Sequence, residues 1–376
     1  MARGAIRVGE VTVRPGERAF GFLHIGYLAA RTEVRIPFQV LHGTQLGPTL
    51  CLESTLHGWE AVGAEILRRA LLRVDPARLR GTIICLPLAN PFSVEFGGTV
   101  ESTGLRINPA DSLDLNRVWP GKREHAWLTE QMAAVLWEEV ITRCDYVVDY
   151  HDGTGACDEI PVTFPRVFPT SGAVIGGDMA GGADGVGVAP VEPVGLSPQA
   201  IREMNEKIRD LAIAWGSSVI WLREEPANPA MLLGSCALHG IVPLYVEAGG
   251  GQALDPTVDQ GVECTLNLLK HLGMIDGTLV LPPRQIMVRN YVVYRSRTGG
   301  YYLPEPDIVL EAQVRKGQLL GRVIDPVTSE VSEECRSPVN GVIVSRRIRL
   351  PINPGGYVAH IADTDSIIWE RENRPS

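Results

Sequence analysis

The 376-residue chain lacks any apolar run long enough to cross a membrane. Its first eighteen residues also lack the apolar core of a signal peptide, since charged residues are mixed with valines there. A basic surplus is missing as well, because 35 Lys and Arg stand against 44 Asp and Glu, giving a formal net charge of −9. Nucleic-acid binders need positive charge to neutralise phosphates. We therefore expect a cytoplasmic protein that binds neither membranes nor nucleic acid.

Closely spaced cysteines are also missing. The seven cysteines are scattered through the chain and form no close pair. Disulfide frameworks are typical of small secreted domains, so reduced and mostly buried thiols are expected here. Cys157 follows a glycine-containing stretch and is the best candidate for exposure, but nothing beside it indicates an activated thiolate, and we expect an inert thiol.

Apolar runs alternate with helix-periodic segments through the first two thirds of the chain. Strands are expected at 34–41, 49–53, 81–88, 146–150, 217–222 and 242–247, and helices at 59–73, 125–144, 198–215 and 254–272. Several strands are apolar on both faces, as in sheets that helices cover on both sides. The order predicts an α/β fold with a largely parallel or mixed sheet flanked by helices. The Gly- and Val-rich stretch 178–198 has little periodicity and predicts a long loop.

The pattern changes at Arg284. From there on, short β-like segments are separated by Gly, Pro and charged turns, and no segment is long and periodic enough for a helix. We expect a larger domain at 1–280, the linker Leu281-Pro282-Pro283, and an all-β barrel-like domain at 284–376. The smaller domain is expected to shield a site or to make subunit contacts.

Polar residues follow three of the predicted strands. His57 and Glu60, in His57-Gly58-Trp59-Glu60, come after strand 49–53, His151 follows strand 146–150, and Glu247 ends strand 242–247. Ligands of open α/β sheets bind beyond the carboxyl ends of strands. Imidazole nitrogens and carboxylate oxygens are common zinc ligands, and a catalytic zinc needs three from the protein. The remaining histidines lack such placement and are expected to be surface or hydrogen-bonded polar residues: His24, His42, His125, His239, His271 and His360.

A polar loop at 101–121 contains Asn116 and Arg117. An arginine can hold a carboxylate through two parallel hydrogen bonds, and an asparagine beside it adds a neutral donor. A solvated loop is the alternative interpretation of the pair. The same two interpretations apply to Arg106 in that loop.

Five motifs follow one another along residues 35–275, namely His57-Gly58-Trp59-Glu60, Asn90-Pro91, Asp114-Leu115-Asn116-Arg117, Asp149-Tyr150-His151 and Glu247-Ala248-Gly249-Gly250. Their order resembles the succinylglutamate desuccinylase/aspartoacylase family of zinc carboxypeptidase-like deacylases. The resemblance implies that 1–280 is a zinc-dependent deacylase catalytic domain with one zinc ion (Zn2+) per subunit. The residues that it implies are zinc ligands His57, Glu60 and His151, the general acid/base Glu247, the substrate-binding pair Asn116 and Arg117, and, by a looser match, Arg106 as the arginine that polarises the scissile carbonyl.

Two positions depart from the pattern of that family. Trp59 stands where Asn or Asp is usual, and Asp152-Gly153-Thr154 follows His151 where a Ser-Gly type turn is usual. Neither change removes a ligand, but both alter the wall of the site, so the substrate of a relative does not transfer to this chain. Trp59 fits core packing on its helix as well as it fits a substrate contact.

The implied activity is hydrolysis of the amide bond of a small N-acyl amino acid or related amide, with a carboxylate on the substrate. Glu247 would accept a proton from the activated water and pass it to the leaving amine. A metallocarboxypeptidase acting on short peptides would use the same ligands. A non-catalytic metal- or ligand-binding protein is the third alternative, and the four filled positions argue against it. Acidic residues after the metal-binding turn would favour a cationic amine unless they are solvated: Asp152, Asp158 and Glu159. A monomer and a homo-oligomer fit equally well.

Overall fold

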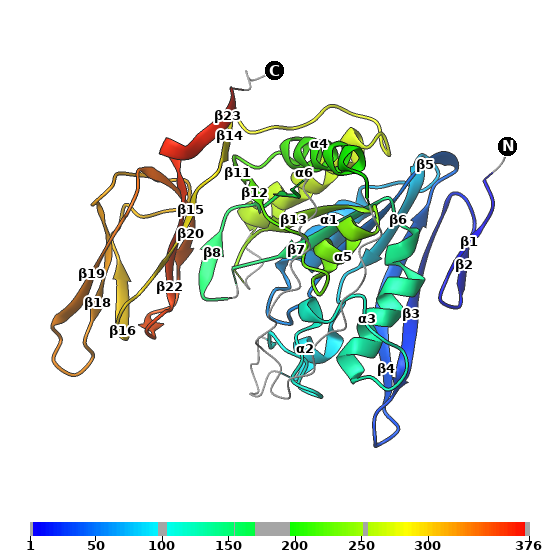
Figure 1. Cartoon of the computed structure of the whole chain (residues 1–376), viewed down its shortest axis with the longest axis horizontal. Coiled ribbons are helices and arrows are strands. Elements are labelled where there is room, and N and C mark those ends of the chain that lie inside the picture. The colour runs from blue at the N-terminus through cyan, green and yellow to red at the C-terminus, as the bar shows by residue number, and fades with distance from the viewer. Residues whose placement is uncertain (1–2, 97–103, 154, 170–195, 251–254, 373–376) are drawn as a thin grey trace.

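The computed structural model describes residues 3–96, 104–153, 155–169, 196–250 and 255–372. A ten-stranded mixed sheet forms the centre of the molecule (Figure 1), in the order β23-β14-β11-β9-β13-β7-β5-β6-β4-β3. Its strands are β3 (Glu17–Tyr27), β4 (Glu33–His42), β5 (Gln45–Ser54), β6 (Arg80–Leu86), β7 (Tyr146–His151), β9 (Val162–Thr163), β11 (Val219–Trp221), β13 (Val242–Glu247), β14 (Arg284–Val288) and β23 (Ile367–Glu372). Most of the expected loop at 178–198 lies outside the described residues.

Three neighbouring parallel strands, β13, β7 and β5, form the middle of this sheet. Glu247 at the end of β13 pairs in register with His151 of β7, and Tyr150 of β7 pairs with Ser54 of β5. Their buried positions run without alternation, because helices cover both faces. All three strands end at the same edge, so the polar residues that follow them meet there.

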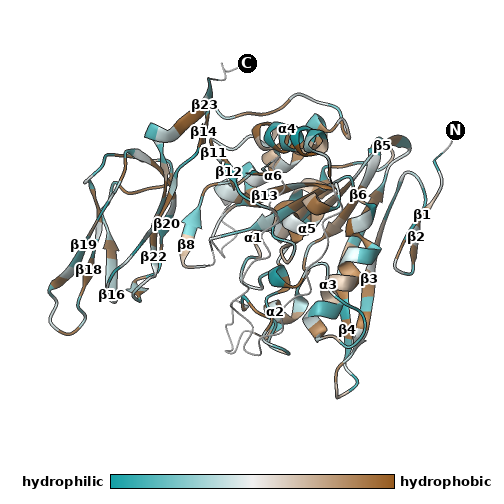
Figure 2. Ribbon diagram, viewed as in Figure 1, coloured by the Kyte–Doolittle hydropathy of each residue, from teal (hydrophilic) through white to brown (hydrophobic). Residues whose placement is uncertain are grey.

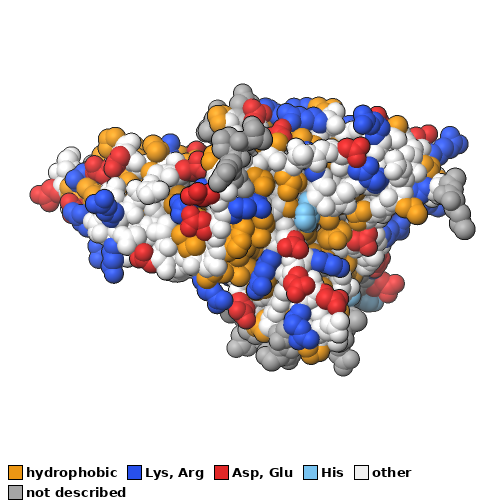
Figure 3. Space-filling view, turned by 90° about the horizontal axis from the view of Figure 1, so that it is seen from above, with side chains coloured by type: hydrophobic (Ala, Val, Ile, Leu, Met, Phe, Trp, Pro, Cys, Tyr) orange, Lys and Arg blue, Asp and Glu red, His pale blue; other side chains and the backbone are white. Residues whose placement is uncertain are grey.

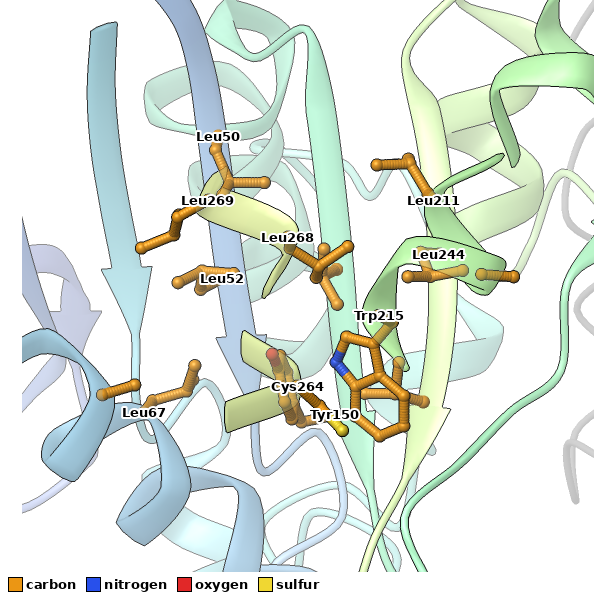
Figure 4. Close-up of a cluster of buried hydrophobic side chains, with 14 of the residues drawn as sticks. Leu50, Leu52, Leu67, Tyr150, Leu211, Trp215, Leu244, Cys264, Leu268 and Leu269 are labelled. Carbon is orange, nitrogen blue, oxygen red and sulfur yellow. The ribbon is translucent and has the colours of Figure 1, made fainter. Parts of the chain in front are cut away.

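Helices cover the sheet on two sides. The helices α1 (Val62–Leu72), α4 (Pro198–Trp215) and α6 (Asp255–His271) share one hydrophobic cluster with the sheet, and α3 (Leu128–Glu139) and α5 (Leu232–Leu238) share another. Figure 4 shows the first cluster, where Leu52 of β5 and Leu244 of β13 lie among side chains of α4 and α6. The hydrophilic residues of α4 (teal in Figure 2) are on its solvent side, as its amphipathic sequence predicts. The predicted mixed α/β sheet is confirmed.

The C-terminal region consists of strands, as its turn-rich sequence predicts. One sheet contains β15 (Tyr291–Arg295), β22 (Tyr357–Asp363), β20 (Gly341–Arg347) and β17 (Gln313–Val314), and the other β19 (Val331–Arg336), β18 (Leu319–Ile324), β16 (Gly300–Pro304) and β21 (Pro351–Ile352). A separate hydrophobic cluster fills the space between them. Among the described residues after 284 there is no α-helix, only the 3-10 turn η3 (Thr364–Ser366).

The sheets cross the proposed boundary between residues 280 and 284. Strands β14 and β23 extend the central sheet, and β8 (Cys157–Glu159) of the larger region pairs with β20 of the C-terminal region. In Figure 1, β8 lies between the two. The domain division stays a prediction, and the pairing means that residues after 284 come close to the edge where β7 and β13 end.

The smaller elements complete the described chain. They are β1 (Ile6–Val8), β2 (Val11–Val13), α2 (Pro91–Glu95), η1 (Leu115–Arg117), η2 (Ile141–Arg143), β10 (Arg166–Val167) and β12 (Arg223–Glu224). All seven cysteines are free and buried, which confirms the expected reduced thiols. In the described part of the chain, no helix combines the length and apolarity that a bilayer crossing requires. Basic and acidic side chains are interspersed on the face shown in Figure 3.

Candidate functional site

His57, Glu60 and His151 converge at the carboxyl edge of the central sheet. Each offers one ligand atom, and the three atoms lie within 4.8 Å of one another. The Oε2 atom of Glu60 lies 2.8 Å from Nδ1 of His57 and 2.5 Å from Nδ1 of His151. Each of the three side chains is only 3% exposed. Two imidazole nitrogens thus face one carboxylate oxygen in a site shielded from water.

The backbone around Gly58 fixes the turn that carries His57 and Glu60. A Cβ atom on Gly58 would lie 1.9 Å from the carbonyl oxygen of Ser93, so no other residue fits without moving the chain. The Gly58 N–H donates to the carbonyl of Leu105 at 2.7 Å, and the Glu60 N–H donates to the carbonyl of His57. The close approach of α2 and the following loop therefore sets the direction of both ligands.

A second carboxylate stands behind each histidine. Nε2 of His57 lies 3.3 Å from Oδ1 of Asp114, and Nε2 of His151 lies 3.0 Å from Oδ2 of Asp149. Among the described residues neither Nε2 has a well-aligned hydrogen-bond partner, so these are charge contacts. Outer carboxylates of this kind orient metal-binding histidines and raise their basicity. Asp149 precedes His151 by two residues on one strand, a spacing that places both on the same face.

The charges of the cluster suit a divalent cation. Burial would raise the pKa of Glu60, but His57 and His151 hold it far below its usual range. Burial, followed by the charge of Asp149, raises the pKa of the neighbouring Glu53 well above its usual range. Burial would also raise the pKa values of Asp114 and Asp149, but the neighbouring histidines lower them. The donor set, with these carboxylates around the two imidazoles, fits a zinc ion held by His57, Glu60 and His151.

Trp59 packs against the proposed ligand set. Its indole Nε1 donates to Oε1 of Glu60 at 3.3 Å, the carboxylate oxygen that does not face the histidines. Its side chain is partly buried. Trp59 therefore orients Glu60. This contact with a proposed metal ligand differs from both the core packing and the substrate contact that its sequence position suggested.

Trp59→Phe is expected to weaken zinc binding about tenfold, at the lower end of the loss typical for outer-sphere contacts. Phenylalanine keeps an aromatic ring, smaller than the indole, and removes the donor to Glu60. Competition of the protein with a chromophoric chelator measures the affinity. Trp369→Phe on β23, far along the sheet, is the matched control, and equal affinities of the two variants would contradict the role of Trp59.

A cavity of about 350 Å³ opens over the three proposed ligands. Its size is at the small end of ligand pockets. It is lined by His57, Glu60, Arg106, Asn116, Arg117, His151, Asp152, Gly153, Cys157, Arg166, Arg223, Met231, Tyr245, Glu247, Tyr357 and His360. The lining includes all seven residues proposed from the sequence as metal ligands, as the general acid/base or as substrate contacts of the family pattern, but not Trp59, Asp158 or Glu159. Burial raises the pKa of the Cys157 thiol to about 12, which agrees with an inert thiol.

Glu247 lies in the same cavity, one strand away from His151. The Tyr245 hydroxyl donates to Oε1 of Glu247 at 2.7 Å, and the Tyr245 ring stacks on His151 with centroids 4.7 Å apart. Burial, and next the charge of Glu159, raises the pKa of Glu247 well above its usual range. A carboxylate with raised proton affinity next to the metal cluster is suited to take a proton from water.

Asn116 and Arg117 sit on η1, which Asp114 begins. The Asp114 carboxylate accepts from the Asn116 N–H at 2.8 Å, and the Asn116 side-chain oxygen accepts from the Leu232 N–H at 3.0 Å. This leaves the Asn116 amide nitrogen for the cavity. Arg117 donates to the carbonyl of Asn116 at 2.7 Å, and within the described parts of the chain it forms no ion pair. Arg106 donates to Asp114 at 3.1 Å, so its charge is already compensated.

The structure adds cavity residues that the sequence reading did not select. Arg166 and Arg223 lie opposite each other on the parallel pair β10–β12 and share the carboxylate of Glu225. His360, expected to be a surface or hydrogen-bonded residue, has a side chain only 14% exposed, and neither ring nitrogen has a hydrogen-bond partner in the described chain. Glu159, which the sequence suggested as a solvated residue or a contact for a cationic amine, is fully buried and is not part of the cavity lining. Only the pairing of distant strands brings Arg166, Arg223 and His360 to the cavity.

Comparison with known proteins supports the resemblance that the sequence motifs carry. Residues 46–166 match the sequence model of the succinylglutamate desuccinylase/aspartoacylase catalytic domain, which covers less than half of the chain. The match confirms the family resemblance of the motifs. No curated protein sequence matches the chain.

Solved structures show the same fold over nearly the whole chain. The product-bound ectoine utilization protein EutE (DoeB) from Ruegeria pomeroyi is 22% identical with a TM-score of 0.73, over 96% of this chain and 99% of that chain. A succinylglutamate desuccinylase from Silicibacter sp. TM1040 is 21% identical with a TM-score of 0.72, over 92% and 95%. A succinylglutamate desuccinylase/aspartoacylase from Rhodobacter sphaeroides is 21% identical with a TM-score of 0.70, over 95% and 96%. The similarity includes the C-terminal β region.

Proposed function

We propose that the chain is a zinc-dependent hydrolase that cleaves the amide bond of a small N-acyl amino acid or related amide. The observation that carries the proposal is one small cavity that contains the His57–Glu60–His151 cluster, the base candidate Glu247 and the guanidinium of Arg117, which forms no ion pair with any described residue. The family match over residues 46–166 supports the same reaction class.

The residues divide the work by position. When bound, the zinc supplies Lewis acidity that activates water near neutral pH and polarises a carbonyl. Glu247 takes a proton from the attacking water and returns it to the leaving nitrogen as the amide bond breaks. Tyr245 holds Oε1 of Glu247, and so directs the carboxylate toward the cluster against which the Tyr245 ring stacks. Arg106 lines the same cavity and is the candidate for a contact with the acyl oxygen.

The charges in the cavity favour a substrate with a carboxylate. Asp114 compensates Arg106, and Glu225 is shared between Arg166 and Arg223, so positive charge remains in the cavity wall. Burial lowers the pKa of Arg117 somewhat, but an arginine stays charged at neutral pH. An anionic group on the substrate, held by Arg117 and the free amide of Asn116, would fix the scissile bond over the metal cluster.

Metal analysis followed by an activity screen tests the proposed function. We expect one zinc per chain and turnover of N-acyl amino acids, with the products detected by mass spectrometry. Faster cleavage of short peptides would instead establish the metallocarboxypeptidase alternative. A chain without stoichiometric metal that is inert toward a broad N-acyl panel would establish the non-catalytic alternative. Subunit number is measured in parallel by light scattering, since a homo-oligomer is compatible with the proposal.

Arg117→Lys is expected to lower kcat/KM about 10- to 100-fold, because a charged hydrogen bond contributes roughly 1.5–3 kcal/mol. Lysine keeps the charge but cannot offer two parallel donors to a carboxylate. The loss should appear mainly in KM, with the zinc content unchanged. Arg123→Lys, at a surface ion pair with Glu138, is the control. An unchanged KM for an acidic substrate would remove Arg117 from substrate binding.

A further inference from the structure

Asp152 connects the two segments that carry the proposed metal ligands. It directly follows His151, and its side chain is buried. Its Oδ2 atom accepts a hydrogen bond at 3.3 Å from the backbone N–H of Val62, the first residue of α1. Glu60 lies only two residues before Val62. One buried carboxylate thus links the end of β7 to the turn that carries His57 and Glu60.

This distant carboxylate serves as the cap of α1. The residue at the N-cap position, Ala61, makes no side-chain hydrogen bond to the helix. The first backbone N–H groups of a helix have no partner within the helix, so an oxygen from elsewhere stabilises them. A carboxylate at this end also compensates the positive end of the helix dipole. Because Asp152 and Val62 are 90 positions apart in the chain, this cap fixes where α1 begins relative to β7.

The first turn of α1 packs tightly against the strand ends. A Cβ atom on Gly63 would lie 2.6 Å from the Cβ atom of Tyr150 and 2.6 Å from the hydroxyl oxygen of Ser54. A Cβ atom on Gly249, two residues beyond β13, would lie 3.0 Å from the side chain of Val62. The absence of a side chain at both glycines therefore lets α1 start in direct contact with the ends of β5 and β7 and with the segment after β13.

Main-chain hydrogen bonds fix the position of Asp152 on the other side. The Gly153 N–H donates to the carbonyl of Gly249 at 2.9 Å, and the Ala248 N–H donates to the carbonyl of His151 at 3.1 Å. Asp152 lies between these two bonds in the chain. Its side chain therefore reaches α1 from a backbone that the neighbouring segment holds in place.

We propose that Asp152 is a positioning residue that holds the turn of His57 and Glu60 at the distance from His151 that one zinc ion requires. The inference rests on the proposed function for the identity of the metal site. Metal ligands must be held in place by the groups behind them if the site is to be formed before the metal binds. The solvated position that the sequence allowed for Asp152 is excluded, because its side chain is buried.

Two substitutions of Asp152 separate its hydrogen bond from its charge. Asp152→Ala removes both and is expected to weaken zinc binding about 10- to 100-fold, as is typical when a group that supports a metal ligand is lost. Asp152→Asn keeps an acceptor oxygen for the Val62 N–H and is expected to lose only about two- to fivefold, the size of a carboxylate–dipole interaction. Competition with a chromophoric chelator measures the affinity.

Asp145→Ala is the matched control. Asp145 stands just before β7, at the other end of the strand, and it too accepts from a backbone N–H of a distant segment, that of Thr49 at 2.8 Å. This variant should bind zinc as the wild type does. Gly63→Ala disturbs the same junction without changing Asp152, because the added Cβ pushes α1 away from Tyr150. It should weaken zinc binding as Asp152→Ala does, and it carries the test if Asp152→Ala does not fold.

Thermal unfolding with and without zinc distinguishes positioning from a general loss of stability. A general loss lowers the Tm of the zinc-free and the zinc-bound protein alike, whereas a weakened site reduces the rise in Tm that zinc produces. The proposal predicts the second result for Asp152→Ala.

Two results would overturn the inference while leaving the proposed function intact. One is wild-type zinc affinity in Asp152→Ala, including the case in which only the KM for a substrate with a cationic amine rises. The other is an equal loss of zinc affinity in Asp145→Ala. A wild-type protein that binds no zinc would instead refute the proposed function, and this inference with it.

Discussion

Glu247→Gln is expected to lower kcat about 10³-fold, within the range of about 10²–10⁴ that a positioned general base contributes. The amide keeps the size of the side chain and its contact with the Tyr245 hydroxyl, but it cannot accept a proton from water. Steady-state kinetics on the best N-acyl substrate measures the loss. Because the change touches neither His57, Glu60 nor His151, KM and zinc stoichiometry should stay close to wild type.

Glu225→Gln provides the matched control for that experiment. Glu225 is an acidic neighbour of the cavity that pairs with Arg166 and Arg223, and it has no contact with Glu247 among the described residues. Its loss should change KM for anionic substrates more than kcat. Turnover by Glu247→Gln near the wild-type rate, with zinc still bound, would show that another group accepts the proton.

His151→Ala is expected to lower zinc affinity by more than about 100-fold, beyond the 10- to 100-fold typical of outer partners. The site would be left with two ligands where a catalytic zinc needs three. Zinc per chain after dialysis, measured by mass spectrometry, and competition with a chelator give the affinity, and activity should fall with the bound metal. Zinc restored at high concentration should not restore the wild-type kcat, because the ligand geometry is incomplete.

Asp149→Asn tests the carboxylate behind His151 without removing a proposed zinc ligand. It keeps His151 but removes the charge 3.0 Å from Nε2, so a smaller loss of about 10- to 100-fold in zinc affinity is expected. His271→Ala, on the exposed end of α6, should bind zinc as the wild type does. If His151→Ala and His271→Ala retain the same zinc content, the metal lies elsewhere.

Part of the cavity wall lies outside the region that the family sequence model matches. The family sequence model ends at residue 166, whereas the cavity contains Tyr357 and His360, and Glu159 depends on Tyr291. The cavity wall therefore includes residues that follow the last of the five motifs, which ends at Gly250, by more than 100 positions.

Local sequence patterns determined most of the elements that carry the site. The apolar runs of β5, β7 and β13 and the periodicity of α1, α4 and α6 reflect burial on faces that the sequence itself displays. Boundaries shifted where a distant residue intervenes. The helix expected from residue 59 begins at Val62, whose N–H donates to the carboxylate of Asp152 at the end of β7.

The sequence did not predict elements that are stabilised mainly by contacts with distant parts of the chain. The edge strand β3 contains Gly21 and Gly26 and exposes Phe20 and Phe22, so its alternation is weak. The short helix α5 is apolar on all sides because it is fully buried between the sheet and η1, where Asn116 accepts the Leu232 N–H. Both depend on contacts with distant parts of the chain.

For the site, the sequence alone determined which residues can bind metal and move a proton, because His57, Glu60, His151 and Glu247 carry that chemistry and follow parallel strands, whose ends meet at one edge. Only the tertiary structure decided what surrounds them. Asp114 reaches His57 across a loop, and Tyr291 of the C-terminal region donates to Glu159 of β8, which pairs with β20. The physical reason is that desolvation and charge act over a few ångströms in space, and no spacing along the chain records which distant strands will be neighbours.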